Sequence, residues 1–206
     1  MLYKYVGQSL AQSANNNYIS KREDGYYQVK IASFELIPED DLITKQGYEL
    51  QSILNTFNSE SVFMKRVNTE CVAMYGEYGF PDTSSYVVDA DQNVVDGMYS
   101  QRFAMINMRN LAIRYDDIKL EIKTDNDLIS TINLIAMVKP CGLNKVFIED
   151  LFTDPQNTNW GFGMRAFTND ALEKINGDSE IPQYRTAKTL IECITFDFIQ
   201  NPKVQN

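Results

Sequence analysis

The sequence predicts an α+β fold with mostly antiparallel sheet, two to four helices and long loops, forming a single compact domain over residues 1–206. Apolar and charged side chains alternate strictly over residues 118–123, as in a half-buried strand. Over residues 63–78, apolar side chains instead recur every three or four positions, as on one face of a helix. No shift in composition marks a domain boundary, and 44% hydrophobic content over 206 residues suffices for one core.

The N-terminal part is predicted to begin with a short strand. A polar, Asn-rich segment follows over residues 8–17, and we expect it to be a mobile arm or loop. Residues 26–37 alternate in two phases, and the change of phase predicts a strand with a β-bulge. Acidic residues 39–41 favour the start of a helix over residues 43–57. The helix over residues 63–78 is expected to end near its glycines.

The next elements predicted are a hairpin over residues 86–95 and a helix over 101–115. Strands follow over 118–123 and 128–138. A further helix is predicted over 168–176 and a final strand over 186–199. The segment 128–138 alternates as a strand returning from 118–123 would, and a helix capped by Asp127 is the alternative. The second helix is expected because Thr168 can cap its start and Gly177 can close its end.

The charge balance excludes several classes of function. Against 28 Asp and Glu stand 19 Lys and Arg, so the net charge is −9, and no sequence-independent binding to nucleic acid is expected. The chain has no histidine, which excludes Ser-His-Asp and Cys-His catalysis. No apolar run approaches the about 20 residues that a membrane-spanning helix needs, so no membrane partner is expected.

The three cysteines are Cys71, Cys141 and Cys193, and they lie far apart in the sequence. An odd number without close spacing suits neither a disulfide framework nor a metal cluster. We therefore expect buried, unpaired thiols and synthesis in a reducing cytoplasm. No cofactor is predicted.

Glu121 and Lys123 lie two positions apart on a predicted strand, so their side chains share one face. This spacing resembles half of the signature of metal-dependent nucleases, in which a carboxylate and a lysine hold a divalent cation and position a water. The resemblance implies a further acidic ligand, for which Asp96, Asp116 and Asp117 are candidates. The favoured interpretation is the solvent-facing side of an amphipathic strand.

Asp89 and Asp91 have the spacing of the first and third ligands of a calcium-binding loop. Val94 stands where that loop needs glycine, and Ser100 stands where it needs glutamate. The polar tip of a hairpin is therefore the favoured interpretation. Metal binding at these aspartates or at Glu121 stays open.

The only tryptophan, Trp160, lies with Phe162 and Arg165 in a long and otherwise polar segment. Trp and Arg are residue types that anchor protein interfaces, so these three residues are candidate interface residues. The alternative is that Trp160 packs on its own domain and pins the loop.

These observations predict a non-enzymatic structural or assembly subunit of a larger complex. Its expected partners are other protein subunits, as a homo-oligomer or in a hetero-assembly, because sheet edges and polar arms often join subunits. A small histidine-free chain of short strands and long polar loops is similar to accessory virion proteins of tailed bacteriophages, such as neck, tail-terminator or baseplate components. The resemblance implies a location in the virion.

Two other functions remain as alternatives. The first is a divalent-metal-dependent nuclease that uses Glu121 and Lys123. The second is an acidic binding or inhibitor protein, whose surface mimics nucleic acid or docks on a basic partner.

Overall fold

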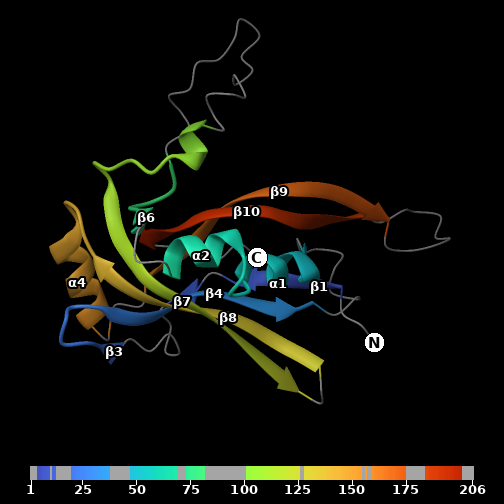
Figure 1. The fold of residues 1–206 in the computed structure, drawn as a ribbon, viewed down its shortest axis with the longest axis horizontal. Helices are drawn as coiled ribbons and strands as arrows, with labels where there is room; N and C mark the ends of the chain where they lie inside the picture. Colours follow the sequence, from blue (N-terminus) through green and yellow to red (C-terminus); the bar gives the residue numbers. More distant parts are fainter. Residues whose placement is uncertain are drawn as a thin grey trace, which may run out of the picture.

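The computed structural model describes residues 4–9, 11–12, 20–37, 47–68, 73–81, 101–125, 128–154, 156, 159–174 and 184–200. Its strands form one ten-stranded sheet that curls into a half-barrel (Figure 1). The strands are β1 (Tyr5–Ser9), β2 (Ala11–Gln12), β3 (Ser20–Lys21), β4 (Tyr27–Leu36), β5 (Gly47–Glu49), β6 (Met74–Glu77), β7 (Leu111–Asp125), β8 (Leu128–Pro140), β9 (Trp160–Lys174) and β10 (Tyr184–Gln200). Their order is β2-β9-β10-β5-β1-β4-β8-β7-β6, with β3 beside β4.

The fold is predominantly β, which corrects the expected α+β class. In the described residues the helices are α1 (Leu50–Phe57), α2 (Val62–Asn68) and α4 (Lys145–Thr153), and a helical turn covers residues 101–104. Neighbouring strands in the described residues pair antiparallel except β5 and β10, which run parallel. The sheet is therefore mostly antiparallel, as predicted, but strands account for a larger share of the chain than the sequence analysis predicts.

The curled sheet brings its last strand, β6, back to β10. Tyr78 forms a parallel bridge with Phe198, and the Gly79 amide donates to the Phe198 carbonyl at 2.7 Å. The Tyr115 hydroxyl donates to the Phe196 carbonyl at 2.6 Å. A Cβ at Gly76 would collide with that same carbonyl oxygen, so glycine is needed for this close approach. β6 and β10 thus close one end of the half-barrel.

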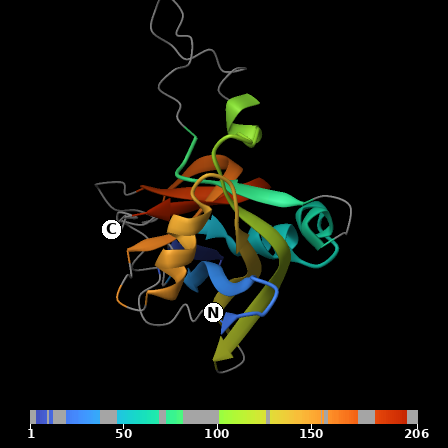
Figure 2. The ribbon, with the colours of Figure 1, turned by 90° about the vertical axis from the view of Figure 1, so that its left-hand side faces the viewer.

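Aromatic side chains fill the interior. Phe57 of α1 meets Phe63 of α2 and Phe196 of β10, with ring centroids 5.4 and 6.1 Å apart. Beside the last residues of β10, Trp160 packs on Phe152 of α4, with ring centroids 4.7 Å apart. These contacts hold α1 and α2 on one part of the sheet and α4 on another (Figure 2). Burial of such rings is the main source of stability in a sheet of this kind.

Several predicted strands are confirmed. β4 covers most of residues 26–37, and its register shifts between Lys30 and Ala32, where the bulge was expected. β7 contains residues 118–123, and β8 returns beside it, so the helical alternative for 128–138 is wrong. β10 contains the final strand predicted over 186–199.

Other predictions are wrong because strand pairing overrides local pattern. The helix over residues 168–176 is instead the end of β9, which pairs with β10 as far as Lys174. The helix over 63–78 ends with α2 at Asn68, and β6 follows. Of the helix over 101–115, only 101–104 is helical, and β7 begins at Leu111. The helix α4 was not predicted.

The expected arm over residues 8–17 is described only in part. Gln8 and Ser9 belong to β1, and Ala11–Gln12 form β2, while residues 13–17 lie outside the described residues. The predicted hairpin over 86–95 also lies outside them. Within the described ranges, no helix is long and apolar enough to cross a membrane.

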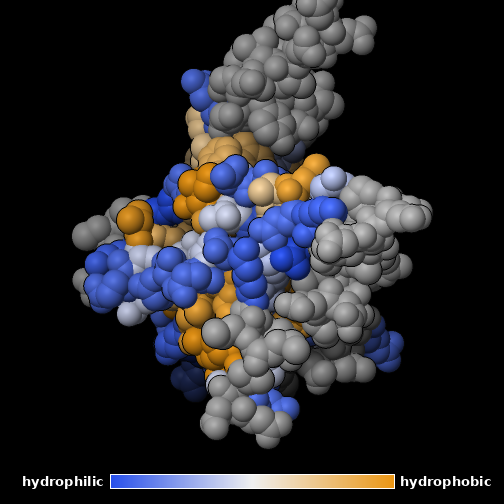
Figure 3. All heavy atoms as spheres, turned by 90° about the vertical axis from the view of Figure 1, so that its right-hand side faces the viewer, coloured by the Kyte–Doolittle hydropathy of each residue, from blue (hydrophilic) through white to orange (hydrophobic). Residues whose placement is uncertain are grey.

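The β7–β8 and β9–β10 pairs extend beyond the core as two ribbons that point the same way (Figure 1). Residues 121–125 of β7 are all exposed, and most of residues 169–174 of β9 are too. Seen from that side, a band of hydrophilic residues crosses the molecule between apolar areas (Figure 3).

Candidate functional site

On the side of β10 opposite β9, a gap lies between its contacts with β5 and its contacts with β6. We call this gap the seam. β10 pairs with β5 at Ala187 and Lys188, and it contacts β6 from Thr195 onward, where Thr195 Oγ1 donates to the Tyr75 carbonyl. The helices α1 and α2 cover the strand in between, and their side chains take the place of a strand partner. The Leu190 amide donates to Ser52 Oγ of α1 at 3.0 Å.

From α2, Arg66 Nη2 donates to the carbonyls of Cys193 and Ile194 at 3.1 and 2.7 Å. The guanidinium also lies over the Phe63 ring, 5.6 Å from its centroid. Polar backbone groups of β10 are therefore satisfied by helix side chains, as burial requires.

A pocket of about 740 Å³ lies at this seam, between the two helices and the middle of β10. Its volume falls in the range of roughly 300–1,000 Å³ that is typical of binding sites for small molecules and peptide side chains. Val62 and Ile191 are largely exposed at the pocket, although both are apolar. Ile191 occupies the register shift between Leu190 and Glu192. The bulge thus directs an apolar side chain away from the β9 pairing.

Two carboxylates and one guanidinium line the same pocket, from Glu49, Glu192 and Arg66. Arg66 is occupied by the β10 carbonyls, and its Nε has no hydrogen-bond partner among the described residues. Glu192 is exposed, and Glu49 is half-buried at the end of β5. The pocket therefore combines apolar side chains with a negative rim.

Most hydroxyls in the pocket hydrogen-bond to the backbone. Ser52 Oγ donates to the Glu49 carbonyl, Thr56 Oγ1 donates to the Ser52 carbonyl, and Ser61 Oγ accepts from the Met64 amide. These bonds stabilise the ends and turns of α1 and α2. They leave these hydroxyls in structural roles.

Thr189 differs, because its Oγ1 donates to a carboxylate, Glu49 Oε2, at 3.4 Å. The thiol of Cys193 also lines the pocket, but burial raises its pKa well above the usual value, so it is not a thiolate at neutral pH. A hydroxyl beside a carboxylate can act as a nucleophile beside its base. Thr189 and Glu49 are the residues of the pocket with that geometry.

A second polar cluster lies buried on the outer side of β9–β10. Arg165 donates from Nε and Nη2 to both oxygens of Asp197, at 2.8 and 2.6 Å, and from Nη2 to Glu77 at 3.0 Å. Arg102 adds two bonds to Glu77, at 3.0 and 2.8 Å. Arg165, Asp197 and Glu77 are fully buried, so each charge depends on its partners.

This charged cluster, Glu77–Arg102–Arg165–Asp197, fastens residues 101–110 to the sheet. Arg165 Nη1 donates to the carbonyls of Phe103 and Met105, and the Asn107 amide donates to Glu77. Burial alone would raise the pKa of Glu77. The bonds from Arg102 and the Asn107 amide, with the charge of Arg165, outweigh it and lower the pKa to about 2. Glu77 is thus ionised throughout the physiological range, and the cluster is structural.

The three predicted interface residues lie inside the chain. Trp160 is 2% exposed, and Phe162 and Arg165 are fully buried. Trp160 packs on its own domain, which was the stated alternative, and Arg165 belongs to the charged cluster. A role for these residues in an interface stays a prediction.

Of the proposed nuclease residues, Asp116, Asp117, Glu121 and Lys123 lie on β7. Glu121 and Lys123 are exposed, and Asp117 pairs with Lys119 at 3.3 Å. Across the described ranges, no three acidic, cysteine or histidine residues are grouped so as to hold a metal ion. Asp89, Asp91, Asp96 and Cys71 lie outside the described residues.

The burial expected of the cysteines is found fully for one of the two described cysteines and partly for the other. Cys193 is buried and Cys141 is half-buried, and both are unpaired. Burial raises the pKa of the Cys141 thiol as well. Neither is suited to nucleophilic attack at neutral pH.

The pocket was not found from the sequence. Ser52 and Arg66 occupy ordinary helix positions, and only their position opposite β10 gives them a role. The charged cluster had a signal: Arg165 and Asp197 each interrupt a run of buried aromatic and aliphatic residues, and they carry opposite charges.

These features define a half-barrel β protein with a helix-covered seam pocket. A family profile described as the Peptidase S80 family matches residues 5–206. Because the match covers nearly all of the sequence, the chain belongs to the Peptidase S80 family. No curated protein and no solved structure matches it significantly.

The family match corrects one prediction and supports part of another. The expectation of a non-enzymatic protein is overturned, because the chain belongs to a family of peptidases. The coarser expectation of a phage-associated protein is supported, whereas the match does not distinguish a neck or tail subunit.

Proposed function

We propose that the protein acts in phage-particle assembly by binding an extended segment of another phage protein in the seam pocket. The observation that carries this proposal is the pocket itself, with exposed apolar side chains and a carboxylate rim along β10. Apolar side chains left at a pocket mouth favour a ligand that covers them. The family match supports a polypeptide as that ligand, since peptidases bind polypeptides.

The rim indicates which polypeptide fits. Glu49 and Glu192 line the pocket, and the whole chain carries a net charge of −9. Both favour a cationic segment, the second through long-range attraction. Val62 and Ile191 favour aliphatic residues beside the cationic ones. A segment with alternating basic and aliphatic residues meets both requirements.

The binding experiment uses a fluorescein-labelled peptide of alternating lysine and valine, followed by fluorescence anisotropy. We expect Glu192→Lys to weaken binding about tenfold, because it replaces an attractive charge with a repulsive one. The matched control is Glu121→Lys, which makes the same charge change on the exposed part of β7, away from the pocket. Equal loss in both variants, or equal binding of a glutamate–valine peptide, would contradict the proposal.

A second candidate function is hydrolysis of the bound segment, which the Thr189–Glu49 contact and the family match favour. Glu49 would accept the hydroxyl proton as Thr189 Oγ1 attacks the peptide carbonyl, and the proton would pass to the leaving amine. Water would then cleave the resulting ester and regenerate the hydroxyl. No histidine is needed for these steps.

Mass spectrometry of the same peptide after incubation tests hydrolysis. We expect cleavage by the native chain and a loss of about 100-fold or more in Thr189→Val, with peptide binding retained. Thr186→Val, on the same strand but outside the pocket, is the control. An uncut peptide, or equal cleavage by Thr189→Val, rules out this mechanism and leaves the binding proposal standing.

The place of the protein in the particle is also a proposal. The exposed ribbons β7–β8 and β9–β10 offer long strand surfaces of the kind by which virion subunits pair. This supports residence in the virion, as a neck, tail-terminator or baseplate component, beside the assembly role.

A further inference from the structure

Arg66 of α2 lines the seam pocket and has no acidic partner in the described residues. The arginines that do pair with carboxylates are Arg22, Arg102, Arg165 and Arg185. Arg109 and Arg114 have no such pair either, but both are exposed to solvent. Arg66 is half-buried, so its charge is partly shielded from water without a counter-ion beside it. A charge held in this way favours an anionic ligand.

The donors of Arg66 that a ligand can reach belong to Nη1. Nη2 makes both bonds to the β10 carbonyls, whereas Nη1 donates to no atom of the described residues. Of the three nitrogens only Nε is buried without a partner, so Nη1 keeps contact with solvent. The bonds from Nη2 and the contact with the Phe63 ring hold the guanidinium in place. Nη1 therefore presents two N–H donors in a fixed position.

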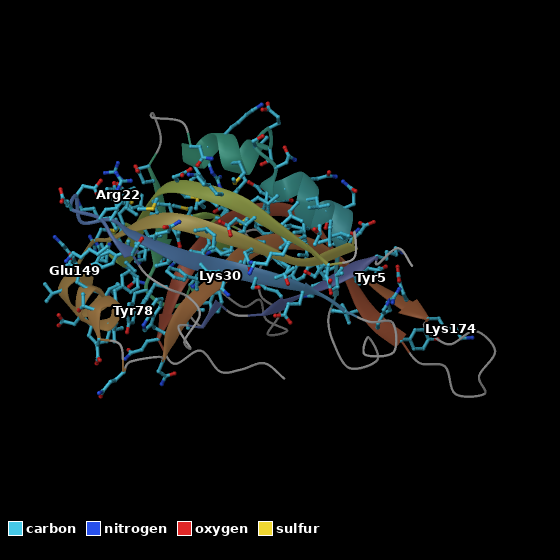
Figure 4. The ribbon with its side chains drawn as sticks, turned by 90° about the horizontal axis from the view of Figure 1, so that it is seen from below. Tyr5, Arg22, Lys30, Tyr78, Glu149 and Lys174 are labelled. Carbon is cyan, nitrogen blue, oxygen red and sulfur yellow. The ribbon has the colours of Figure 1, made fainter. Side chains whose placement is uncertain are left out.

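Other cations lie away from this position. Among the described residues that line the pocket, Arg66 is the single cation, and it lies among two carboxylates. Labelled cations that lie apart from α1 and α2 in Figure 4 are Arg22, Lys30 and Lys174. Lys65, the neighbour of Arg66 in α2, is exposed and pairs with Glu60 at 2.9 Å. An anion in the pocket would thus meet the guanidinium of Arg66 and no other positive charge of the lining.

The surrounding charge decides which anion fits. Glu49 and Glu192 line the same pocket, and the whole chain carries a net charge of −9. A nucleic acid or another polyanion would meet this negative charge along its whole length, whereas one carboxylate needs only the guanidinium. Arginine binds carboxylates through short, charge-assisted hydrogen bonds. A basic segment that carries a single carboxylate therefore satisfies both the rim and Arg66.

We propose that Arg66 Nη1 binds one carboxylate of the polypeptide that occupies the seam pocket. The carboxylate belongs either to the free C-terminus of the segment or to an acidic side chain beside its basic residues, and both offer the same pair of oxygens. This inference rests on the proposed binding function. It adds a third requirement to the bound segment, which is then basic, aliphatic and anionic at one point.

Three forms of the lysine–valine peptide, each with fluorescein at its N-terminus, test this subsite by fluorescence anisotropy. One has a free C-terminal carboxylate, one has a C-terminal amide, and one is an amide whose last residue is glutamate. We expect a carboxylate form to bind about tenfold more tightly than the plain amide, because it adds a charge-assisted bond at a partly buried site. Preference for the free acid assigns the C-terminus, and preference for the glutamate form assigns a side chain.

The native chain alone separates this inference from the function on which it rests. Equal binding of all three peptides would overturn the carboxylate subsite and leave the proposed binding function standing. Binding of none of them would overturn both.

Variants of α2 test the assignment to Arg66. Arg66→Gln should abolish the preference for a carboxylate, whereas Lys65→Gln, which removes an exposed charge from the same helix, should keep it. The preference is a ratio within each variant, so a general loss of affinity does not change it. A preference that is unchanged in Arg66→Gln, or lost in Lys65→Gln, would overturn the proposal.

Arg66→Lys covers the case in which Arg66→Gln does not fold after losing its bonds to β10. Lysine keeps the positive charge but not the fixed guanidinium, so we expect the preference to fall without disappearing. An undiminished preference in Arg66→Lys would contradict the assignment.

Discussion

Replacing Arg165 with methionine is expected to lower the free energy of unfolding by about 3–5 kcal/mol, the usual cost of removing one partner from a buried ion pair. Asp197 would lose both of its bonds from the guanidinium, and Glu77 would lose one. The backbone carbonyls of Phe103 and Met105 would lose their bonds from Arg165 as well, although Met105 would keep one from Arg102. Urea denaturation followed by circular dichroism measures the change.

The double variant Arg165→Met with Asp197→Leu removes both charges of the pair, so it shows how much of the loss comes from leaving Asp197 without its partner. Because apolar residues of similar volume often replace a buried pair at little cost, we expect it to recover a large part of the loss. Lys119→Ala removes an exposed pairing with Asp117 on the same sheet and should change stability little. A small effect in Arg165→Met, or a double variant less stable than the single one, contradicts this account.

Acid should destabilise the fold as the pH falls from about 4.5 towards 2. Folding lowers the pKa of Glu77 from its ordinary value of 4.5 to about 2, so the folded state favours the ionised form. The stabilisation is fully present above the higher value and is lost as the pH falls through the lower one. The difference corresponds to about 3 kcal/mol for this buried group.

Urea denaturation at a series of pH values between 7 and about 2.5 measures the effect. Glu77→Gln should show a flatter dependence in the acid range, at a lower overall stability. Glu173 provides the comparison, because bonds from Tyr5 and Arg185 lower its pKa to about 2 as well, at a partly exposed site. We expect Glu173→Gln to flatten the curve less. A Glu77→Gln curve parallel to the native one contradicts the prediction.

The strands that the sequence predicts correctly are those whose two faces differ. At the start of residues 118–123, buried Ile118 and half-buried Leu120 alternate with exposed Lys119 and Glu121, so the alternation is visible. The end of β9 has no such contrast, because it extends beyond the core and both of its faces are largely exposed. Thr168 and Gly177 then imitate helix boundaries, and only pairing with β10 decides the conformation.

The candidate sites depend on contacts that sequence patterns do not contain. Ser52 and Leu190 are separated by 138 positions, and Arg66 and Cys193 by 127. No local spacing relates such residues, so the seam pocket follows only from the curl of the sheet. The buried pair of Arg165 and Asp197 could be predicted more readily from the sequence, because a charge between aromatic residues in a strand needs a partner.

The position of β10 in the sheet has a consequence for how the chain folds during synthesis. β10 joins β9 to β5 and also closes the half-barrel against β6. Until residues 184–200 have left the ribosome, β5 and β6 lack this common neighbour, and their apolar faces stay open to water. Assembly of the sheet therefore waits until β10 has been synthesised, and such distant pairing is slow. Nascent chains spend that interval prone to association with one another.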